Sequence, residues 1–455
     1  MRRPLLLALA VVLAAVAACD ASAPAPPATP PEPDALAEWL RQTAWPLDAA
    51  APRADVSDLR WLDGVVGDAR VVGLGEATHG TREFFQIKDR IVCYLVDELG
   101  FDAVVFEGDL GPGAAVDAYV RGGPGDPAAL VGGFGLWPWD TEEVAALVRG
   151  LRDRGGAARF YGADVQYPFL QADAVVAAVE RVEPDSADAV RERLACLAAP
   201  WGGTTAQRAA LLRAYAGRRS PQLAACRQAV LDVGAYLDRR AAAYEAALGR
   251  EAALVRRAAR AVAEGERLAR AAGGESYFYL RDRAMADNVR WVLDHLGPDA
   301  RVVVWTHNVH VSRSVDDLPT MGEFLDAELG DDYRALGFAF HRGAVTGVRD
   351  GRLGTADVGA GPADGYGALF ASAGLPLFAL DLGDLGGAAA PLAERRPFRQ
   401  YGAVVGDGPV GGARLADWFD AVVFVETSTP TRLLPGAGGA APPRAPGGAG
   451  GAAVR

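Results

Sequence analysis

Histidine and carboxylate side chains come directly after apolar segments at several places along the chain. They are Glu76, His79, Glu107, Asp164, His307 and His310. Histidine titrates close to neutral pH, so it can accept and return a proton during a reaction. A neighbouring carboxylate can orient the imidazole and stabilise its charged form. If these side chains meet in the fold, they predict an acid–base site of the kind that hydrolases use.

The apolar segments before these residues predict buried strands rich in Val, Phe and Ala. The segments are 70–74, 102–106, 158–162, 301–305, 335–340, 377–380 and 421–425. Several of them are followed by helical periodicity, which is typical of a mainly parallel sheet with helices on both faces. We therefore predict a three-layer α/β fold. The carboxyl ends of parallel strands share one edge, so the polar residues should meet in one crevice.

Two other parts of the chain have distinct compositions. Residues from about 171 to 296 are rich in Ala, Arg, Leu and Glu and contain almost no strand pattern, which predicts a large helical insertion in the sheet domain. Residues 435–455 are mostly Gly, Ala and Pro and predict a disordered tail. The predicted α/β domain therefore spans 36–434.

The N-terminus predicts export. Arg2 and Arg3 precede an apolar run that ends at Cys19, and this run is short for a membrane-spanning helix. The ending resembles a bacterial lipobox, so we expect residues 1–19 to be a lipoprotein signal peptide whose cysteine is acylated. The alternative is an ordinary cleaved signal with an incidental cysteine. Residues 20–35, rich in Ala and Pro, would then tether an exported domain to the membrane of the cell envelope.

The remaining cysteines fit an oxidising compartment. Cys196 and Cys226 lie in one helical stretch, where a hairpin would bring them together, and we predict a disulfide between them. Cys93 lies among apolar residues with helical spacing and is interpreted as a small buried hydrophobe.

Composition excludes one class of partner. The 455 residues carry a net charge of −12, which gives no electrostatic footprint for nucleic acid. Half of the residues are hydrophobic, enough for a large core. Of the 46 basic residues only Lys88 is a lysine, and the others are arginines. We therefore consider Lys88 a candidate functional residue.

An ordered set of motifs resembles the erythromycin esterase family over nearly the whole predicted domain. The matching segments are 75–80, 83–85 with Lys88, 99–101, 106–107, 137–139, 160–164, 281–282 with Met285 and Asn288, 305–310, 321–322 and 419–421. The resemblance implies an α/β sheet with a helical subdomain. It also implies a hydrolase, and the best-known members inactivate macrolide antibiotics by opening the lactone ring, which confers antibiotic resistance.

The resemblance also implies roles for individual residues. The essential histidine of the family falls on His79, its acidic companion on Glu76, the second acidic residue on Glu107, and the paired histidines on His307 and His310. Lys88 stands where some esterases of the family have arginine, and an ammonium cannot reproduce the planar fork of a guanidinium. The expected substrate-binding residues are His310, Asp164, Trp137 and Arg281.

Water is the expected nucleophile, because the chain has neither a Gly-x-Ser-x-Gly nor a Ser-x-x-Lys motif. We expect His79 to take the proton of the water, with Glu76 or Glu107 stabilising the imidazolium. His307 and Lys88 would polarise the carbonyl of an ester or lactone. No cofactor is expected in this mechanism.

Two alternatives use the same residues. The Glu and His side chains also suit a divalent metal that would activate the water on a different substrate. A non-catalytic lipoprotein that binds an envelope component is the other alternative. His295 and His341 lie outside the motifs and are interpreted as structural or surface residues.

Overall fold

The computed structural model describes residues 33–53, 55–197, 205–272, 274, 276–316, 318–406 and 411–437. The predicted signal peptide with Cys19, most of the tether and most of the tail lie outside the described residues. Among the described residues, no helix is both long enough and apolar enough to cross a membrane.

A nine-stranded sheet forms the centre of the described part of the chain, in the order β1-β8-β11-β6-β2-β5-β3-β4, with β7 paired to β6. Its strands are β1 (Trp45–Pro46), β2 (Val71–Leu74), β3 (Ala103–Asp109), β4 (Arg159–Asp164), β5 (Val302–Trp305), β6 (Tyr333–Arg349), β7 (Arg352–Asp357), β8 (Leu377–Asp381) and β11 (Ala421–Ser428). The six strands from β11 to β4 are parallel, whereas β8, β1 and β7 run antiparallel to their neighbours. The predicted mainly parallel sheet is confirmed, and all seven predicted strands are present.

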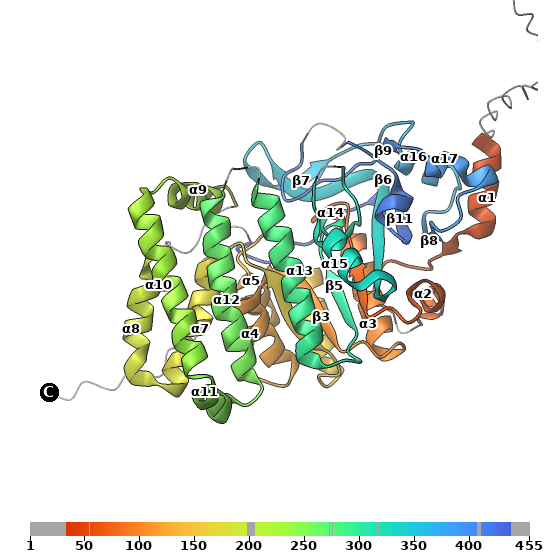
Figure 1. The fold of residues 1–455 in the computed structure, drawn as a ribbon. Coiled ribbons are helices and arrows are strands. Elements are labelled where there is room, and N and C mark those ends of the chain that lie inside the picture. The colour runs from red at the N-terminus through yellow and green to blue at the C-terminus, as the bar shows by residue number, and fades with distance from the viewer. Residues whose placement is uncertain are drawn as a thin grey trace, which may run out of the picture.

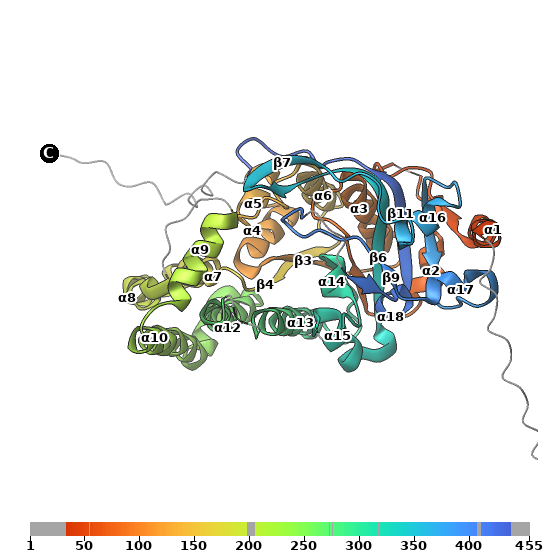
Figure 2. The ribbon, with the colours of Figure 1, turned by 90° about the horizontal axis from the view of Figure 1, so that it is seen from above.

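Helices cover both faces of this sheet (Figures 1 and 2). One face packs against α2 (Trp61–Val66), α3 (Arg82–Asp97) and α6 (Glu142–Asp153), and the other against α1 (Pro33–Thr43), α13 (Ser276–Leu296), α15 (Met321–Leu329) and α16 (Tyr366–Ala371). Side chains alternate between two cores along each strand, so Val72 joins the first core and Val71 the second. The predicted three-layer arrangement is therefore confirmed.

The segment between β4 and β5 is helical, as predicted. Its helices are α7 (Pro168–Val182), α8 (Pro184–Leu194), α9 (Thr205–Ala216), α10 (Ser220–Arg239), α11 (Ala241–Leu248), α12 (Glu251–Arg270) and α13. The helices α7, α8, α10, α11 and α12 share a third apolar core, at the end of the molecule far from α1 (Figure 1). The helix α13 instead packs its Met285 and Val289 against the sheet. The insertion thus forms a subdomain and then returns to the sheet through α13.

Shorter elements complete the described fold. They are α4 (Leu110–Val120), α5 (Pro127–Gly132), α14 (Asn308–Val311), α17 (Ala390–Ala393), α18 (Leu415–Trp418), β9 (Arg396–Pro397), β10 (Gly412–Ala413) and four 3₁₀ turns at 57–59, 195–197, 330–332 and 387–389. The strands β9 and β10 pair with each other outside the main sheet.

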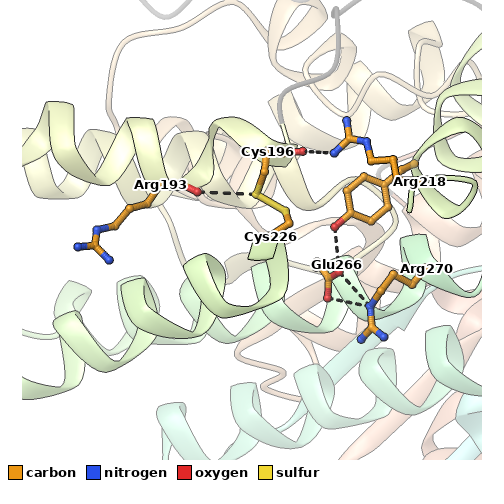
Figure 3. Close-up of a disulfide and its surroundings, with 7 residues drawn as sticks. Arg193, Cys196, Arg218, Cys226, Glu266 and Arg270 are labelled. Carbon is orange, nitrogen blue, oxygen red and sulfur yellow. Dashed lines mark hydrogen bonds and ion pairs between the residues drawn. A yellow bond between two sulfur atoms is a disulfide. The ribbon is translucent and has the colours of Figure 1, made fainter. Parts of the chain in front are cut away.

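The predicted disulfide between Cys196 and Cys226 is present and joins the turn after α8 to α10 (Figure 3). Their Cα atoms lie 5.6 Å apart, within the usual range for a disulfide. The bond links two residues that are 30 positions apart in the helical subdomain.

Cys93 in α3 is a free, half-buried thiol, and burial raises its pKa to about 12. It therefore stays protonated and is a poor nucleophile.

Candidate active site

The loop between β2 and α3 carries Glu76 and His79, and close backbone packing fixes its path. A Cβ atom on Gly75 would lie 2.2 Å from Oδ1 of Asn308, and one on Gly80 would lie 1.8 Å from the carbonyl oxygen of Thr346. Only glycine permits such close approaches. The two glycines therefore let the loop lie directly against the residues that follow β5 and against strand β6.

Glu76 links His79 to Lys88. Glu76 is completely buried, and its Oε1 accepts a hydrogen bond of 2.9 Å from Nδ1 of His79. Its Oε2 accepts from Nζ of Lys88, which also donates to the carbonyl oxygen of Thr306 at 3.1 Å. The Lys88 ammonium lies 4.3 Å from the ring centroid of Trp305. The imidazole of His79 is thus held by the Glu76 carboxylate, and the Lys88 ammonium balances the negative charge of this carboxylate.

Burial weakens the proton affinity of Lys88. Desolvation lowers its pKa to about 8, although the carboxylates of Glu76 and Glu107 favour the charged form. The ammonium therefore loses its proton at a much lower pH than an exposed lysine would.

Glu107 lies near the end of β3 and accepts hydrogen bonds on both oxygens. Its Oε2 accepts from Oγ1 of Thr306 at 2.5 Å and from the backbone N–H of His307 at 2.9 Å. Its Oε1 accepts from Nη2 of Arg281 at 2.7 Å. Burial disfavours the carboxylate, but electrostatic interactions with His310, His79 and Arg281 outweigh it and hold the pKa of Glu107 well below its usual range. Glu107 is therefore ionised.

Arg281 joins Glu107 to the end of β4. Its Nη2 donates to Oδ2 of Asp164 at 2.7 Å, and its Nε lies 3.2 Å from both Asp164 oxygens. Its Nη1 lies 2.8 Å from Nε2 of His310. Both carboxylates favour the guanidinium, so despite burial they raise the pKa of Arg281 well above its ordinary value. Asp164, which is completely buried, thus positions Arg281 and does not line the pocket.

Asp282 orients His310, a role that the sequence analysis did not assign. Nδ1 of His310 donates to Oδ1 of Asp282 at 2.8 Å, and the same oxygen accepts from the backbone N–H of Met321. Burial lowers the pKa of His310, but the Asp282 carboxylate outweighs it and raises the pKa. A hydrogen bond from Arg281 to Nε2 requires the neutral ring, so a proton on Nε2 would displace Arg281.

His307 caps the first turn of α14 and is neutral. Its Nδ1 accepts from the backbone N–H of Val309 at 3.2 Å, and its Nε2 donates to the carbonyl oxygen of Tyr401 at 3.2 Å. Burial and the adjacent His79 lower its pKa well below the ordinary value. Both ring nitrogens are therefore occupied by the backbone. The ring of His307 lies 5.0 Å from that of His79, measured between centroids.

A pocket of about 350 Å³ opens over these residues. Its walls are His79, Glu107, Leu136, Pro138, Trp139, Gln166, Tyr167, Phe278, Arg281, His307, Val309, His310, Gln400, Gly402 and Ala403. Of the predicted site residues, His79, Glu107, Arg281, His307 and His310 line it, as expected from the shared sheet edge. The other four, Glu76, Lys88, Asp164 and Trp137, are buried and do not line it.

Several walls of the pocket were not predicted from sequence. Trp139 lines it in place of Trp137, with its ring centroid 5.3 Å from that of His79. Gln400, Gly402 and Ala403 line it as well, although none of them belongs to a motif. Trp139 was visible as part of a Trp-Pro-Trp segment, but nothing in that segment indicates which ring faces inward.

Glu76, His79 and Glu107 could also be considered as metal ligands, because their ligand atoms lie within 4.8 Å of one another. Each carboxylate, however, already accepts hydrogen bonds on both oxygens, and each contacts a buried cation, Lys88 or Arg281. A divalent ion would have to displace these donors and approach two positive charges. The donor set therefore fits a metal poorly.

A family model described as "Erythromycin esterase" matches residues 96–428. The matched region contains Glu107, Arg281, His307 and His310, whereas Glu76, His79 and Lys88 precede it.

Individual relatives are distant. The chain is 25% identical to the putative hydrolase YbfO of Bacillus subtilis over 345 residues, 69% of this chain and 74% of that protein. It is also 25% identical to an Escherichia coli erythromycin esterase type II over 334 residues, 67% of this chain and 77% of that protein.

Solved structures share the fold. A crystal structure of a Bacillus cereus protein matches with a TM-score of 0.74 at 24% identity, covering 88% of this chain and 99% of that one. A mutant of the erythromycin esterase EreC in its open conformation matches with a TM-score of 0.64 at 18% identity, covering 84% of this chain and 96% of that one. The family and its hydrolase-named relatives support a hydrolase. Since the family model covers most of the chain, this protein belongs to the erythromycin esterase family.

Proposed function

We propose that this protein is an exported, lipid-anchored hydrolase that cleaves a carboxylic ester or a macrolactone with water activated by His79. The observation that carries this proposal is the buried Glu76–His79 pair at the wall of the pocket. An imidazole held by a carboxylate through one nitrogen presents the other nitrogen as a base.

His79 is the proposed base. Its Nδ1 is bonded to Glu76, which leaves Nε2 to take a proton from a water in the pocket. The negative charges of Glu76 and Glu107 stabilise the imidazolium that forms, and Lys88 positions Glu76 from behind. After water adds to the carbonyl carbon, the imidazolium returns the proton to the leaving alkoxide. Water thus enters as the hydroxyl of the acid product, and the alkoxide leaves as the alcohol.

Arg281 is the proposed donor to the carbonyl oxygen. A guanidinium has five N–H groups. Those directed at Asp164, Glu107 and His310 account for four, and one N–H on Nη1 is left on a side chain that lines the pocket. His307 and Lys88, which the sequence analysis assigned to this role, have their polar atoms engaged by Tyr401, Val309, Glu76 and Thr306. We therefore propose that Arg281, and not His307 or Lys88, polarises the carbonyl group of the substrate.

The pocket walls are compatible with an ester that carries a bulky apolar group. Trp139 and Val309 provide apolar surface beside His79, and Phe278 at the rim is 48% exposed. A large lactone would place its ester group at His79 and the rest of the ring along Phe278. One relative is described as an erythromycin esterase, which makes a macrolide the first substrate to test.

The proposed location depends mainly on the N-terminal sequence. Arg2 and Arg3, the apolar run and Cys19 together have the pattern of a lipoprotein signal. A disulfide between Cys196 and Cys226 is compatible with an oxidising compartment outside the cytoplasm. An enzyme held at the envelope would meet its substrate before entry into the cell.

A metal-dependent hydrolase is the second candidate, favoured by the close approach of Glu76, His79 and Glu107. In that case the ion would lower the pKa of the bound water and the carboxylates would act as ligands. The two buried cations beside the carboxylates argue against it.

A hydrolysis assay separates these candidates. The full chain with Cys19→Ser, which cannot be acylated, is incubated with erythromycin and with p-nitrophenyl acetate, each with and without a chelator, and products are followed by mass spectrometry. From erythromycin we expect a ring-opened product heavier by one water, and from p-nitrophenyl acetate we expect p-nitrophenol and acetate. Both reactions should be unchanged by chelation and absent with His79→Asn. Activity lost on chelation and restored by a divalent ion would favour the metal candidate. A folded protein inactive on a broad ester panel would contradict the esterase proposal.

A further inference from the structure

A second pocket lies where the helical subdomain meets the edge strand of the sheet. It has a volume of about 440 Å³ and is bounded by α4, α7, α12, α13 and β4, which pack against one another and lie together in Figure 2. It includes Arg159 at the amino end of β4, whereas Asp164 at the other end of this strand belongs to the active site. We call it the arginine pocket, after Arg121, Arg159, Arg181 and Arg250 in its walls.

The arginine pocket carries a surplus of positive charge. Four arginines face two carboxylates, Asp117 and Glu251, which leaves two positive charges in excess on a protein of net charge −12. Asp117 forms a bidentate pair with Arg159 at 2.9 and 2.8 Å. Burial and the nearby arginines lower the pKa of His295, so its ring adds no charge at neutral pH. The walls therefore favour an anion.

Arg250 is an arginine of this pocket without a carboxylate partner among its described contacts. Its Nη2 donates to the carbonyl oxygen of His295 at 3.2 Å. Glu251, the next residue, pairs instead with Arg181 at 3.3 Å and with Arg121 at 3.7 Å. The remaining N–H groups of Arg250 can therefore bind an added anion without breaking an ion pair.

Tyr161 supplies a second, independent indication of a ligand. This residue is only 2% exposed, it lines the arginine pocket, and its hydroxyl has no hydrogen-bond partner among the described residues. A buried hydroxyl without a partner costs free energy. Burial raises the pKa of Tyr161, so the hydroxyl keeps its proton and can donate it. An anionic oxygen in the pocket would satisfy it.

The rest of the wall is apolar and fits a hydrocarbon body. The small side chains of Ala114, Ala118, Ala174 and Ala178 come from α4 and α7, and Leu254 and Val255 come from α12. We propose that the arginine pocket binds an organic carboxylate with an apolar body, its head group held by Arg250 and the Tyr161 hydroxyl. Arginine matches the planar carboxylate group, and the alanine wall accepts the apolar part.

Octanoate is the probe, and octanol is its uncharged control because it has a similar apolar body. Binding to the full chain with Cys19→Ser is measured by isothermal titration calorimetry. We expect one octanoate per chain, with octanol at least about tenfold weaker because a charge-assisted hydrogen bond is lost. Tyr161→Phe and Arg250→Gln should each weaken octanoate binding by roughly fivefold to tenfold. The control Arg283→Gln, at a partly exposed residue that lines neither pocket, should have no effect.

Two further variants locate the bound probe. Ala174→Phe fills the arginine pocket and should abolish octanoate binding, whereas Phe278→Trp at the rim of the active site should leave it unchanged. Circular dichroism confirms that each variant is folded. The proposal is overturned if octanoate fails to bind, if octanol binds equally well, or if Phe278→Trp abolishes binding while Ala174→Phe does not. Because no arm uses turnover, this result is independent of the hydrolysis assay.

Discussion

Lys88 donates a hydrogen bond to Glu76 in the interior of the protein, twelve residues away along the chain. It is the only lysine in the sequence, and it lies against the ring of Trp305 without lining the pocket. Its position behind Glu76 assigns it to holding the carboxylate in place. We therefore expect substitutions at Lys88 to act through Glu76, which contacts His79, and through Thr306, which contacts Glu107.

The first prediction concerns His79. His79→Asn keeps the size and polarity of the side chain but removes the base, so kcat should fall by roughly 10²-fold or more with little change in KM. Steady-state kinetics on the best ester from the hydrolysis assay measures this. His341→Asn is the matched control, because His341 does not line the pocket, and it should be nearly silent. A His79→Asn variant with most of the parent activity would refute the base assignment.

The second prediction concerns the pH dependence set by Lys88. With a pKa of about 8, Lys88 is charged below this pH and neutral above it. The charged ammonium holds the Glu76 carboxylate, so its loss should lower kcat/KM as the pH rises through 8. Lys88→Arg keeps its charge at high pH, so in this variant the fall should move up by at least about one pH unit. An identical alkaline limb in Lys88→Arg would show that another group controls the profile.

This alkaline loss of activity should occur without unfolding. The unfolded chain holds the Lys88 proton more tightly, since the ordinary pKa is 10.5. Keeping Lys88 charged in the folded state therefore costs stability below pH 8, and the cost disappears as the pH rises towards 10.5. Circular dichroism between pH 7 and 9.5 should show no loss of structure attributable to this residue.

The third prediction compares two arginines on α13. Arg281→Lys retains a charge for Asp164 and Glu107 but cannot make four directed contacts and also donate to a substrate oxygen. We expect kcat/KM to fall by roughly 10²-fold. Arg283→Lys makes the same change two residues away, at a partly exposed pair with Asp287 and Glu328, and should leave kinetics unchanged. Equal effects of the two substitutions would contradict the role of Arg281.

The fourth prediction concerns the disulfide. Its removal by Cys196→Ala should lower the free energy of unfolding of the helical subdomain by roughly 2–4 kcal/mol, because the bond restricts the unfolded chain. Urea denaturation with and without reductant measures this. The parent and Cys93→Ala should both lose stability in reductant, whereas Cys196→Ala should not respond. A parent protein that is insensitive to reductant would contradict the prediction.

The fifth prediction concerns localisation. Cys19→Ala removes the residue that we expect to be acylated, so the protein should leave the membrane fraction while its enzyme domain remains folded. Fractionation of expressing cells, followed by an assay of each fraction, measures this. The parent chain provides the comparison. Membrane partition that is the same in both proteins would refute the lipid anchor.

The sequence alone determined the architecture and which polar residues lie at the carboxyl ends of the parallel strands. Strands β2, β3, β4 and β5 are short, apolar and followed by helices, so their parallel pairing was predictable. That pairing brings Glu76, His79 and Glu107 within reach of one another. Strand β7 was missed because it lies at an edge and only one of its six residues is buried, so it lacks the apolar pattern.

The tertiary structure alone decided how the polar side chains are paired. Arg281 lies 174 residues from Glu107, and it reaches Glu107 only because α13 returns from the helical subdomain to the sheet. The same packing brings Asp282 to His310. Periodicity along a chain reports which residues are buried, but the partner of a buried charge depends on which helix covers which strand. For that reason the position of His307 at the pocket was predictable, whereas the engagement of both its nitrogens by Val309 and Tyr401 was not.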